Sequence, residues 1–318
     1  MIKSAETDVL VIGSGLSGAI AAIAAAEENK RVILITNSET LVSGNTRWAQ
    51  GGIAYSPNIK KQKELKEDIF VSGSHHNHKQ AVYQLVDMGP KLIEDLLIDK
   101  LQVPFEKNSK GQLMFTSEAA HSTKRIIHCK DATGLTIHKQ IIDQLINHSQ
   151  IITYTQHTAI DLLTYSHHSV SSIDVYSEPT CFGAVTLNHK TNEVKNIFAN
   201  QTILATGGLG QIYLHSTNPI ESRGDGVAMA WRAGARCINL HYIQFHPTSL
   251  YHDTGRFLIS EALRGEGATL YDVNGHNFME SIHPLQDLAP RDIVARGIHQ
   301  TLINTQHPCV YLDISHKK

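Results

Sequence analysis

The chain has 318 residues, which is enough for one large domain or two of ordinary size. Hydrophobic residues make up 41% and charged residues 18%, the balance of a soluble globular protein. The net charge of -2 gives no electrostatic footprint for nucleic acid or for an acidic membrane surface, so the sequence excludes both as partners.

The cysteines and the apolar runs exclude several further classes of protein. The four cysteines stand singly with no CxxC spacing, so neither a zinc ribbon nor a disulfide framework is indicated. The first strand begins within ten residues of Met1, which leaves no room for a signal peptide. No run reaches the roughly 18 apolar residues that span a bilayer. We therefore expect a cytoplasmic protein.

The first elements form a βαβ unit. Residues 8–12 are an apolar run that ends in glycines, residues 16–28 are alanine-rich with a helical pattern, and residues 31–35 are a second apolar run. Parallel strands joined by a helix predict an α/β sheet.

A GxGxxG sequence, GSGLSG at residues 13–18, joins the first strand to the first helix. In this context Gly13 makes the tight turn, Gly15 lets a pyrophosphate approach the backbone, and Gly18 lets helix and strand pack closely. The motif predicts dinucleotide binding but does not choose FAD over NAD. The acidic residue that usually holds a ribose after the second strand is absent: Thr36 and Asn37 stand there, and Glu39 lies slightly beyond.

Further along the chain the pattern changes twice. Residues 56–70 carry many charges and predict an exposed excursion, and two helices at 76–88 and 90–99 are predicted to break at Gly89-Pro90. Between 151 and 206, short β runs predict a small antiparallel meander, with a polar loop near 166–179. From about residue 240 sheet patterning fades and His, Arg and Glu become dense. We place a domain boundary at 240/241.

Three segments resemble the flavoproteins of the fumarate reductase and succinate dehydrogenase superfamily. They are NTRWAQGGIA at 45–54, ATGG at 205–208, and GDG at 224–226 with the helical run after it. A Gln-Gly-Gly turn allows backbone N–H groups to face a flat ring edge. Seven further segments resemble the L-aspartate oxidases, FAD enzymes that convert L-aspartate to iminoaspartate. They are EAAHS at 118–122, RIIH at 125–128, DATG at 131–134, QFHPT at 244–248, SEALRGEG at 260–267, LAPRDIVAR at 288–296 and LDISHK at 312–317.

The resemblance implies an FAD-binding Rossmann-like parallel sheet at 1–240 and an α+β capping domain at 241–318. Members with covalent FAD have His where this chain has Asn45, so it implies noncovalent FAD. The cofactor residues it implies, together with the glycine turn, are Gly13, Ser14, Gly15, Leu16, Ser17, Gly18, Thr36, Asn37, Asn45, Thr46, Ala49, Gln50, Gly51, Gly52, Ala205, Thr206, Gly207 and Asp225.

Oxidation of an amino acid through a flavin requires a site for two carboxylates and an ammonium that excludes water. Arginines suit the carboxylates, because their planar fork gives bidentate contacts. The resemblance implies that Arg291 lies at the reacting carbon and that Glu118 binds the ammonium. It also implies that His246, Ser260 and Glu261 surround a substrate carboxylate, and that Arg264 belongs to a proton route.

Each of these residues also has an ordinary interpretation. Arg291 at a helix start could form a surface ion pair, His246 could be a loop histidine, and Glu261 could be a plain helix carboxylate. The ordered set of motifs favours the catalytic interpretation and leaves Arg264 evenly balanced. The histidines at 75, 76 and 78 have no carboxylate or Cys partner at ligand spacing, so we expect a solvated helix start and no metal.

Members of this family continue beyond the equivalent of Lys318, so we expect the capping domain to be truncated and a C-terminal helical domain to be absent. The resemblance implies oxygen or fumarate as electron acceptor and a functional link to quinolinate synthase in NAD biosynthesis. Two alternatives stay open: a soluble fumarate reductase or succinate dehydrogenase-like flavoprotein, and a noncatalytic fragment. We expect residues 8–52 and 201–235 to surround the flavin while residues 240–296 hold the dicarboxylic amino acid.

Overall fold

The computed structural model describes residues 3–116, 121–253 and 255–316. The chain forms two compact units. Met1–Gly51 and Asp131–His241 make up unit 1, whereas Gly52–Lys130 and Tyr242–Lys318 make up unit 2. Residues 52–130, placed with 1–240 in the sequence analysis, thus pack together with residues 242–318. The assignment of a cofactor domain and a capping domain stays a prediction.

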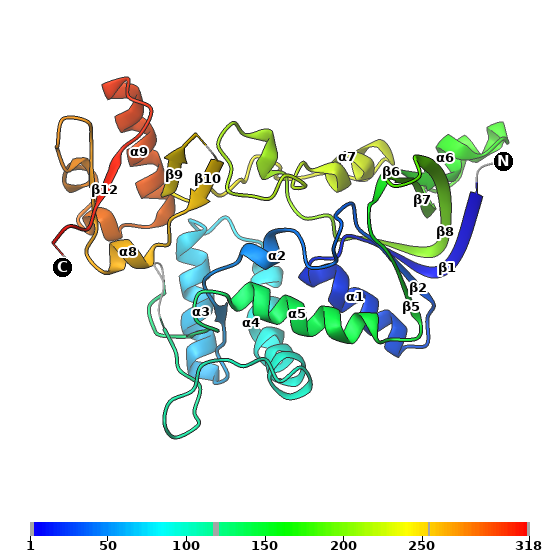
Figure 1. The fold of residues 1–318 in the computed structure, drawn as a ribbon, viewed down its shortest axis with the longest axis horizontal. Helices are drawn as coiled ribbons and strands as arrows, with labels where there is room; N and C mark the ends of the chain where they lie inside the picture. Colours follow the sequence, from blue (N-terminus) through cyan, green and yellow to red (C-terminus); the bar gives the residue numbers. More distant parts are fainter. Residues whose placement is uncertain (1–2, 117–120, 254, 317–318) are drawn as a thin grey trace. The chain divides into compact units, whose positions relative to one another are not determined.

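Unit 1 is built on a six-stranded sheet with the order β5-β2-β1-β8-β7-β6 (Figure 1). The first four strands in this order are parallel, and β8, β7 and β6 form the antiparallel meander. The predicted α/β class with its parallel sheet and meander is confirmed. The strand bounds are β1 Lys3–Ile12, β2 Val32–Ile35, β5 Ile151–Tyr154, β6 His157–Thr164, β7 Cys181–Asn188 and β8 Glu193–Leu204.

Three parallel strands end level with one another. Ile12 is in register with Ile35 of β2 on one side and with Leu204 of β8 on the other. Because the strands are parallel, the segments after all three begin at the same carboxyl edge, where open α/β sheets bind ligands. The register therefore brings residues 13, 36 and 205 together although they are far apart in sequence.

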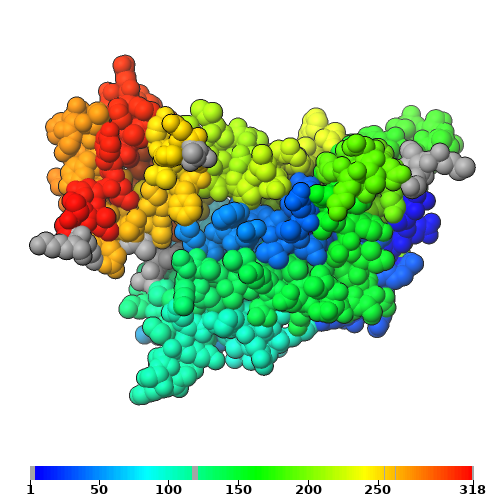
Figure 2. Space-filling view, in the orientation of Figure 1, coloured from blue at the N-terminus to red at the C-terminus, as the bar shows by residue number. Residues whose placement is uncertain are grey.

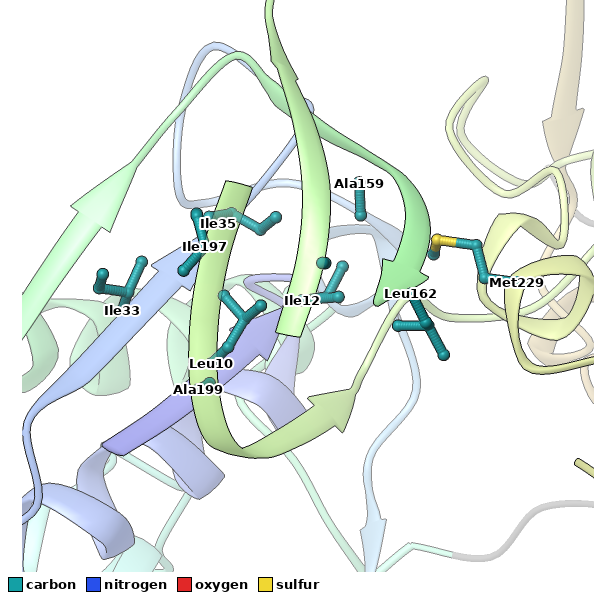
Figure 3. Close-up of a cluster of buried hydrophobic side chains, with 10 residues drawn as sticks. Leu10, Ile12, Ile33, Ile35, Ala159, Leu162, Ile197, Ala199 and Met229 are labelled. Carbon is teal, nitrogen blue, oxygen red and sulfur yellow. The ribbon is translucent and has the colours of Figure 1, made fainter. Parts of the chain in front are cut away.

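One core cluster of unit 1 consists mainly of aliphatic side chains from this sheet (Figure 3). Its buried members come from neighbouring strands and from Met229 on α7 (Asp225–Arg232), which approaches Leu162 of β6. Burial of a Leu or Ile side chain contributes about 1.5–3 kcal/mol, so the cluster fixes the register on which the site depends. The cluster comprises Leu10, Ile12, Ile33, Ile35, Ala159, Leu162, Ala184, Ile197, Ala199 and Met229.

Helices α1 (Leu16–Glu27) and α5 (Thr133–Ile146) lie side by side in unit 1 (Figure 1).

Two predicted features of the β region were wrong. Residues 151–154 are a parallel strand beside β2 and do not belong to the meander. The runs at 193–198 and 201–205, predicted as separate, lie in one continuous strand, β8, which pairs with β7 over 193–198 and with β1 over 195–204. The segment predicted as a loop near 166–179 contains two short helices, α6 Tyr165–His168 and η2 Ser172–Tyr176.

The first segment of unit 2 contains two packed helices, α3 (Ile59–Ser72) and α4 (Lys79–Leu92). The prediction of an exposed excursion at 56–70 was wrong. Leu65 packs against Val82 and Val86 of α4, and the Asn58 side chain caps α3 by accepting a hydrogen bond from Lys61 N at 2.8 Å. His78 caps α4, because its Nδ1 accepts a hydrogen bond from Ala81 N at 3.3 Å.

The break predicted at Gly89-Pro90 is also absent. Helix α4 continues through Pro90, which is buried, and passes at Ile93 into a π-helix, η1 Ile93–Lys100. Proline in a helix interior removes one N–H bond and crowds the preceding turn. We attribute its acceptance here to the burial of one face of α4, which outweighs local propensity.

A buried arginine, Arg125, links helix α3 to the segment that leads into the partner strand of β3 (Ile53–Ala54). Arg125 is fully buried and pairs with Asp68 of α3. Burial alone would raise the pKa of Asp68, but hydrogen bonds from Arg125 and Ser122 lower it. Arg125 also donates to Thr123 Oγ1 at 2.8 Å, so this ion pair ties the neighbouring strand β4 (Ile126–Ile127) to α3.

The second segment of unit 2 is centred on α9 (Arg291–Thr305), which begins at Arg291 as expected from the sequence. Val294 of α9 packs with Leu270, Met279 and Ala289 in a small core.

Figure 2 shows the projecting loop at 107–112 in the first segment, whose residues are exposed. The remaining elements are α2 Asn45–Trp48, η3 Gly210–Ile212, β9 Ser249–His252, β10 Gly255–Leu258, α8 Ala262–Gly265, β11 Thr269–Tyr271, η4 Phe278–Ser281, η5 Gln286–Leu288 and β12 Tyr311–Asp313.

Candidate functional site

The turn between β1 and α1 is held at the carboxyl edge of the sheet. Gly13 has a φ of 114°, and its N–H donates to Ile35 O at 2.9 Å. A Cβ at Gly13 would lie 2.2 Å from Ala205 O, and one at Gly18 would lie 1.9 Å from Gly13 O. These two glycines are therefore required by the protein's own packing.

Gly15 differs from the other two glycines. Its φ is -63°, and the nearest neighbour of a Cβ there would be Thr46 Oγ1 at 3.5 Å. The same Thr46 oxygen accepts a hydrogen bond from Leu16 N at 3.1 Å. Helix α1 has no acidic residue in its first turn, so the positive end of its dipole can attract an anion. The protein alone does not need a glycine at this position, whereas a phosphate approaching the helix N-terminus does.

A pocket of about 700 Å³ opens at this edge of unit 1. Five predicted cofactor residues are not among those that line it: Gly18, Ala49, Gln50, Gly51 and Gly52. Gly52 belongs to unit 2, where a Cβ would lie 2.3 Å from Ile127 O. The predicted residues that line the pocket are Gly13, Ser14, Gly15, Leu16, Ser17, Thr36, Asn37, Asn45, Thr46, Ala205, Thr206, Gly207 and Asp225.

Helix α2 contributes Asn45 and Thr46 and is fixed from two directions. Asn45 Nδ2 donates to the buried Ser222 Oγ at 3.0 Å. Gly134 of α5 packs beneath α2, where a Cβ would lie 2.1 Å from Thr46 O, and its N–H donates to Ala49 O at 2.9 Å. The lack of a side chain at Gly134 thus positions the segment that carries Asn45.

The glycine turn after β8 packs against the start of α7. A Cβ at Gly226 would lie 2.0 Å from Thr206 Oγ1. A glycine at 226 is therefore needed for the ATGG and GDG segments to pack this closely. Gly207 has a φ of 76° and Gly224 a φ of 81°, conformations that favour glycine. Asp225, the first residue of α7, lies at the pocket and 3.6 Å from the guanidinium of Arg223.

His138 of α5 supports the glycine turn from inside the protein. It is fully buried, and its Nε2 lies 2.8 Å from Ser14 O. Since a carbonyl can only accept, Nε2 carries the proton and donates. Its Nδ1 is buried without a partner among the described residues. Burial lowers the pKa of His138, while the bond to Ser14 opposes this effect. The imidazole is therefore neutral in the folded chain.

We expect the free energy of unfolding to fall as the pH drops below about 6.5, the ordinary pKa of histidine. Above that pH both states are neutral and the stability is fully present. Between the unfolded and the lowered folded pKa, only the unfolded chain takes up the proton, so acid favours unfolding.

The measurement is urea unfolding across this pH range, with His138→Gln as the comparison. Glutamine keeps an N–H donor but does not titrate, so the pH dependence should become shallower in this variant. Equal slopes for the two proteins would contradict the assignment. Burial lowers the pKa of His246 as well, so a residual slope is expected.

The second group of predicted residues lies in unit 2 around Glu261. One carboxylate oxygen, Oε1, is 2.9 Å from Arg264 Nη2 and 2.9 Å from Arg291 Nε. The other, Oε2, is buried with no partner in the described part of the chain. A single carboxylate thus bridges two arginines and keeps one acceptor oxygen available.

Arg264 is the buried member of this trio, with 2% of its side chain exposed against 34% for Arg291. Burial lowers the pKa of Arg264, although a guanidinium stays charged. Arg264 Nη1 also donates to Asp287 O at 2.6 Å, and Asp287 Oδ1 accepts from Leu270 N at 3.0 Å. Arg264 is therefore held between Glu261 and the η5 turn.

His246 lies close enough to this trio to be influenced by its charges. Burial lowers the pKa of His246, and Glu261 raises it, whereas the two arginines lower it. Nδ1 of His246 lies 2.8 Å from Thr248 O. The structure thus brings four of the predicted residues together, His246, Glu261, Arg264 and Arg291, and their roles stay predictions. Ser260 is exposed, and Glu118 lies outside the described residues.

Over residues 3–116, 121–253 and 255–316, no group of three or more His, Cys, Asp and Glu side chains could hold a metal ion. Within the same ranges, every helix is too short or too polar to cross a bilayer.

A family model described as FAD binding domain matches residues 8–318. The chain belongs to this FAD-binding family. Its cofactor is FAD. The residues present fit this group, because the space left by Gly15 lies at a helix N-terminus inside a pocket large enough for a dinucleotide.

The relatives of this FAD-binding chain include several L-aspartate oxidases. The chain is 42% identical over 314 residues to L-aspartate oxidase 1 of Ralstonia nicotianae, covering 98% of this chain and 57% of that protein. It is 40% identical over 326 residues to the Pseudomonas aeruginosa enzyme, covering 100% of this chain and 59% of that protein. The resemblance seen in the motifs is confirmed. The chain spans less than two thirds of these relatives.

Solved structures agree on the fold. E. coli quinol fumarate reductase FrdA superposes with a TM-score of 0.85 at 23% identity, covering 100% of this chain and 55% of FrdA. Mycobacterium smegmatis Sdh1 superposes with a TM-score of 0.81 at 27% identity, covering 99% of this chain and 53% of Sdh1.

Sequence reasoning missed several residues that the structure places at these sites. His138, Ser222 and Glu221 come from distant parts of unit 1, and Asp287 holds Arg264 in unit 2. An available signal was the glycine in Asp131-Ala132-Thr133-Gly134, since Gly134 packs beneath α2 on the helix that carries His138. For Glu221 there was no local signal.

Proposed function

We propose that this chain carries the FAD-binding part and a substrate-binding part of an L-aspartate oxidase, which converts L-aspartate to iminoaspartate. The observation that carries the proposal is the 42% identity over 98% of the chain to a named L-aspartate oxidase. The bridged trio of Glu261, Arg264 and Arg291 beside His246 supports it, because these residues suit a dicarboxylate substrate.

In this reaction the substrate loses a hydride from Cα and a proton from nitrogen. FAD, when bound, supplies the two-electron acceptor. Arg291 is the more exposed arginine of the trio, so its guanidinium is the one that a substrate carboxylate can reach. Glu261 orients Arg291 through the 2.9 Å contact to Nε. His246, neutral because burial lowers its pKa, donates from Nδ1 to Thr248 O and so offers Nε2 as a hydrogen-bond acceptor without adding charge.

The contact chain from Arg291 through Glu261 to Arg264 supports a proton route. A proton moving between the two arginines would pass through the shared carboxylate, and the buried Oε2 provides a second acceptor site. Arginine is a poor base in isolation. We therefore propose electrostatic alignment of the substrate as the main role of Arg291.

We propose that FAD is bound noncovalently, because Asn45 has an amide where a covalent link needs an imidazole. Denaturation should release the flavin into the filtrate of a centrifugal filter. Retention of the yellow colour by the denatured chain would contradict this prediction.

Peroxide production tests the function directly. The FAD-loaded chain in air should form peroxide with L-aspartate and not with succinate, and Glu118→Gln should lower the rate with L-aspartate by about 100-fold, since the ammonium loses its ionic partner. Electron transfer with succinate instead would favour the alternative, a fumarate or succinate oxidoreductase. A loaded chain that is inactive with both substrates would be a noncatalytic fragment. The acceptor, the link to quinolinate synthase and the cytoplasmic location stay predictions.

A further inference from the structure

The segment after β2 lacks the carboxylate that dinucleotide-binding folds usually have there. In such folds an acidic residue about 20 residues after the glycine motif, at the end of the second strand, binds a ribose hydroxyl. In this chain β2 ends at Ile35, and Thr36, Asn37 and Ser38 follow at the pocket. None of these three side chains is acidic.

The nearest acidic residue in sequence does not fill this role. Glu39 is exposed, and its Oε1 accepts a hydrogen bond from Gln156 Nε2 at 3.2 Å. Glu39 is not among the residues that line the pocket. Glu39 therefore contacts Gln156 outside the pocket and is not placed to bind a ribose there.

A second carboxylate reaches the same place from a distant part of the chain. Glu221 lines the pocket, is half-buried, and places Oε1 3.4 Å from Ser38 Oγ. These two residues are 183 positions apart. Ser38 belongs to the segment after β2, so the Glu221 carboxylate lies where a ribose-binding carboxylate is expected.

The segment that carries Glu221 is well anchored. The neighbouring Ser222 is buried and accepts from Asn45 Nδ2 at 3.0 Å. Its backbone N–H donates to Pro219 O at 2.9 Å, and its carbonyl accepts from Gln211 N at 2.9 Å. Three bonds therefore fix the backbone beside Glu221, so its carboxylate is presented at low entropic cost.

We propose that Glu221 binds the hydroxyl groups of the adenosine ribose of FAD and replaces the carboxylate missing after β2. An ionised carboxylate offers about four acceptor sites, so the bond from Ser38 leaves capacity for the ribose. The inference rests on FAD as the cofactor and is independent of the substrate that is oxidised.

The test compares FAD with an analogue whose adenosine ribose lacks both hydroxyl groups. The apoprotein is titrated with each flavin, and Kd is read from flavin fluorescence. The unmodified chain should bind FAD about tenfold to one-hundredfold more tightly than the analogue. In Glu221→Ala the two Kd values should become nearly equal, and Glu221→Gln, which keeps one acceptor oxygen, should lie between. The ratio is measured on folded molecules alone, so a loss of stability does not obscure it.

Glu39→Gln is the matched control and should keep the ratio of the unmodified chain. A ratio that Glu221→Ala leaves unchanged would overturn the proposal, and so would a ratio near one in the unmodified chain. Failure to bind either flavin would overturn it together with the cofactor assignment. Normal FAD binding without oxidation of L-aspartate would contradict only the proposed function.

Discussion

Replacing Gly15 by alanine should leave the chain folded and weaken FAD binding on the order of 100-fold, or about 2.7 kcal/mol. The backbone of Gly15 is in a conformation open to any residue, and its Cβ would make only an ordinary contact with Thr46. A methyl group there would occupy the space through which a pyrophosphate approaches the helix. Thermal unfolding of the apoprotein and FAD titration would separate the two effects.

Replacing Gly18 by alanine should mainly lower the stability of the chain rather than its affinity for FAD. Its Cβ would overlap the carbonyl oxygen of Gly13, and we expect a loss of stability on the order of 3 kcal/mol. Gly89→Ala is the control, because its Cβ would meet open space in α4. This variant should gain about 0.5–1 kcal/mol through helix propensity and leave FAD binding unchanged. Equal stabilities of the Gly15 and Gly18 variants would refute the division of roles.

Replacing Glu261 by leucine should destabilise the chain by about 3–5 kcal/mol. Arg264 would then remain buried with only the Asp287 carbonyl as a partner among the contacts described above. The loss comes from a buried charge without its counter-charge rather than from the lost attraction itself. Urea unfolding at neutral pH measures it directly.

Arg291→Leu, at the other end of the same bridge, should leave the free energy of unfolding almost unchanged and remove most of the activity. The Arg291 side chain is one third exposed, and Glu261 stays paired with Arg264 after its loss, so no buried charge loses its last partner. We expect the rate with L-aspartate to fall by about 10²–10³-fold. Arg296→Leu on the same helix is the control, since Arg296 forms an exposed pair with Asp292 and should affect neither quantity. An active Arg291→Leu variant would remove this residue from the proposed site.

The sequence predicted the parts of the fold whose signals are local. The first βαβ unit, the glycine turn and the start of α9 at Arg291 all follow from short periodic runs with clear boundaries. The charged segment at 56–70 misled because charge was taken as evidence against a helix. Asn58 as a cap and the spacing of Leu65 and Ile69 were helix signals that should have outweighed it.

Other features depend on contacts between distant segments. Proline at 90 is tolerated because α4 buries one face against α3, which no local rule includes. Residues 151–154 follow helix α5, and that order was a signal for a parallel strand. The motifs pointed to His246, Glu261, Arg264 and Arg291, which lie together in the structure. The positions of His138 and Glu221, in contrast, depend on separations of 124 and 183 residues.

The most direct measurement is a crystal structure of the chain grown with FAD and a dicarboxylate such as succinate. We expect the pyrophosphate to lie against Gly15 at the N-terminus of α1. We also expect Arg291 to hold one carboxylate of the ligand next to the isoalloxazine ring, with His246 beside it. Flavin density away from the turn at 13–18, or both of these side chains directed away from the ring, would contradict the account.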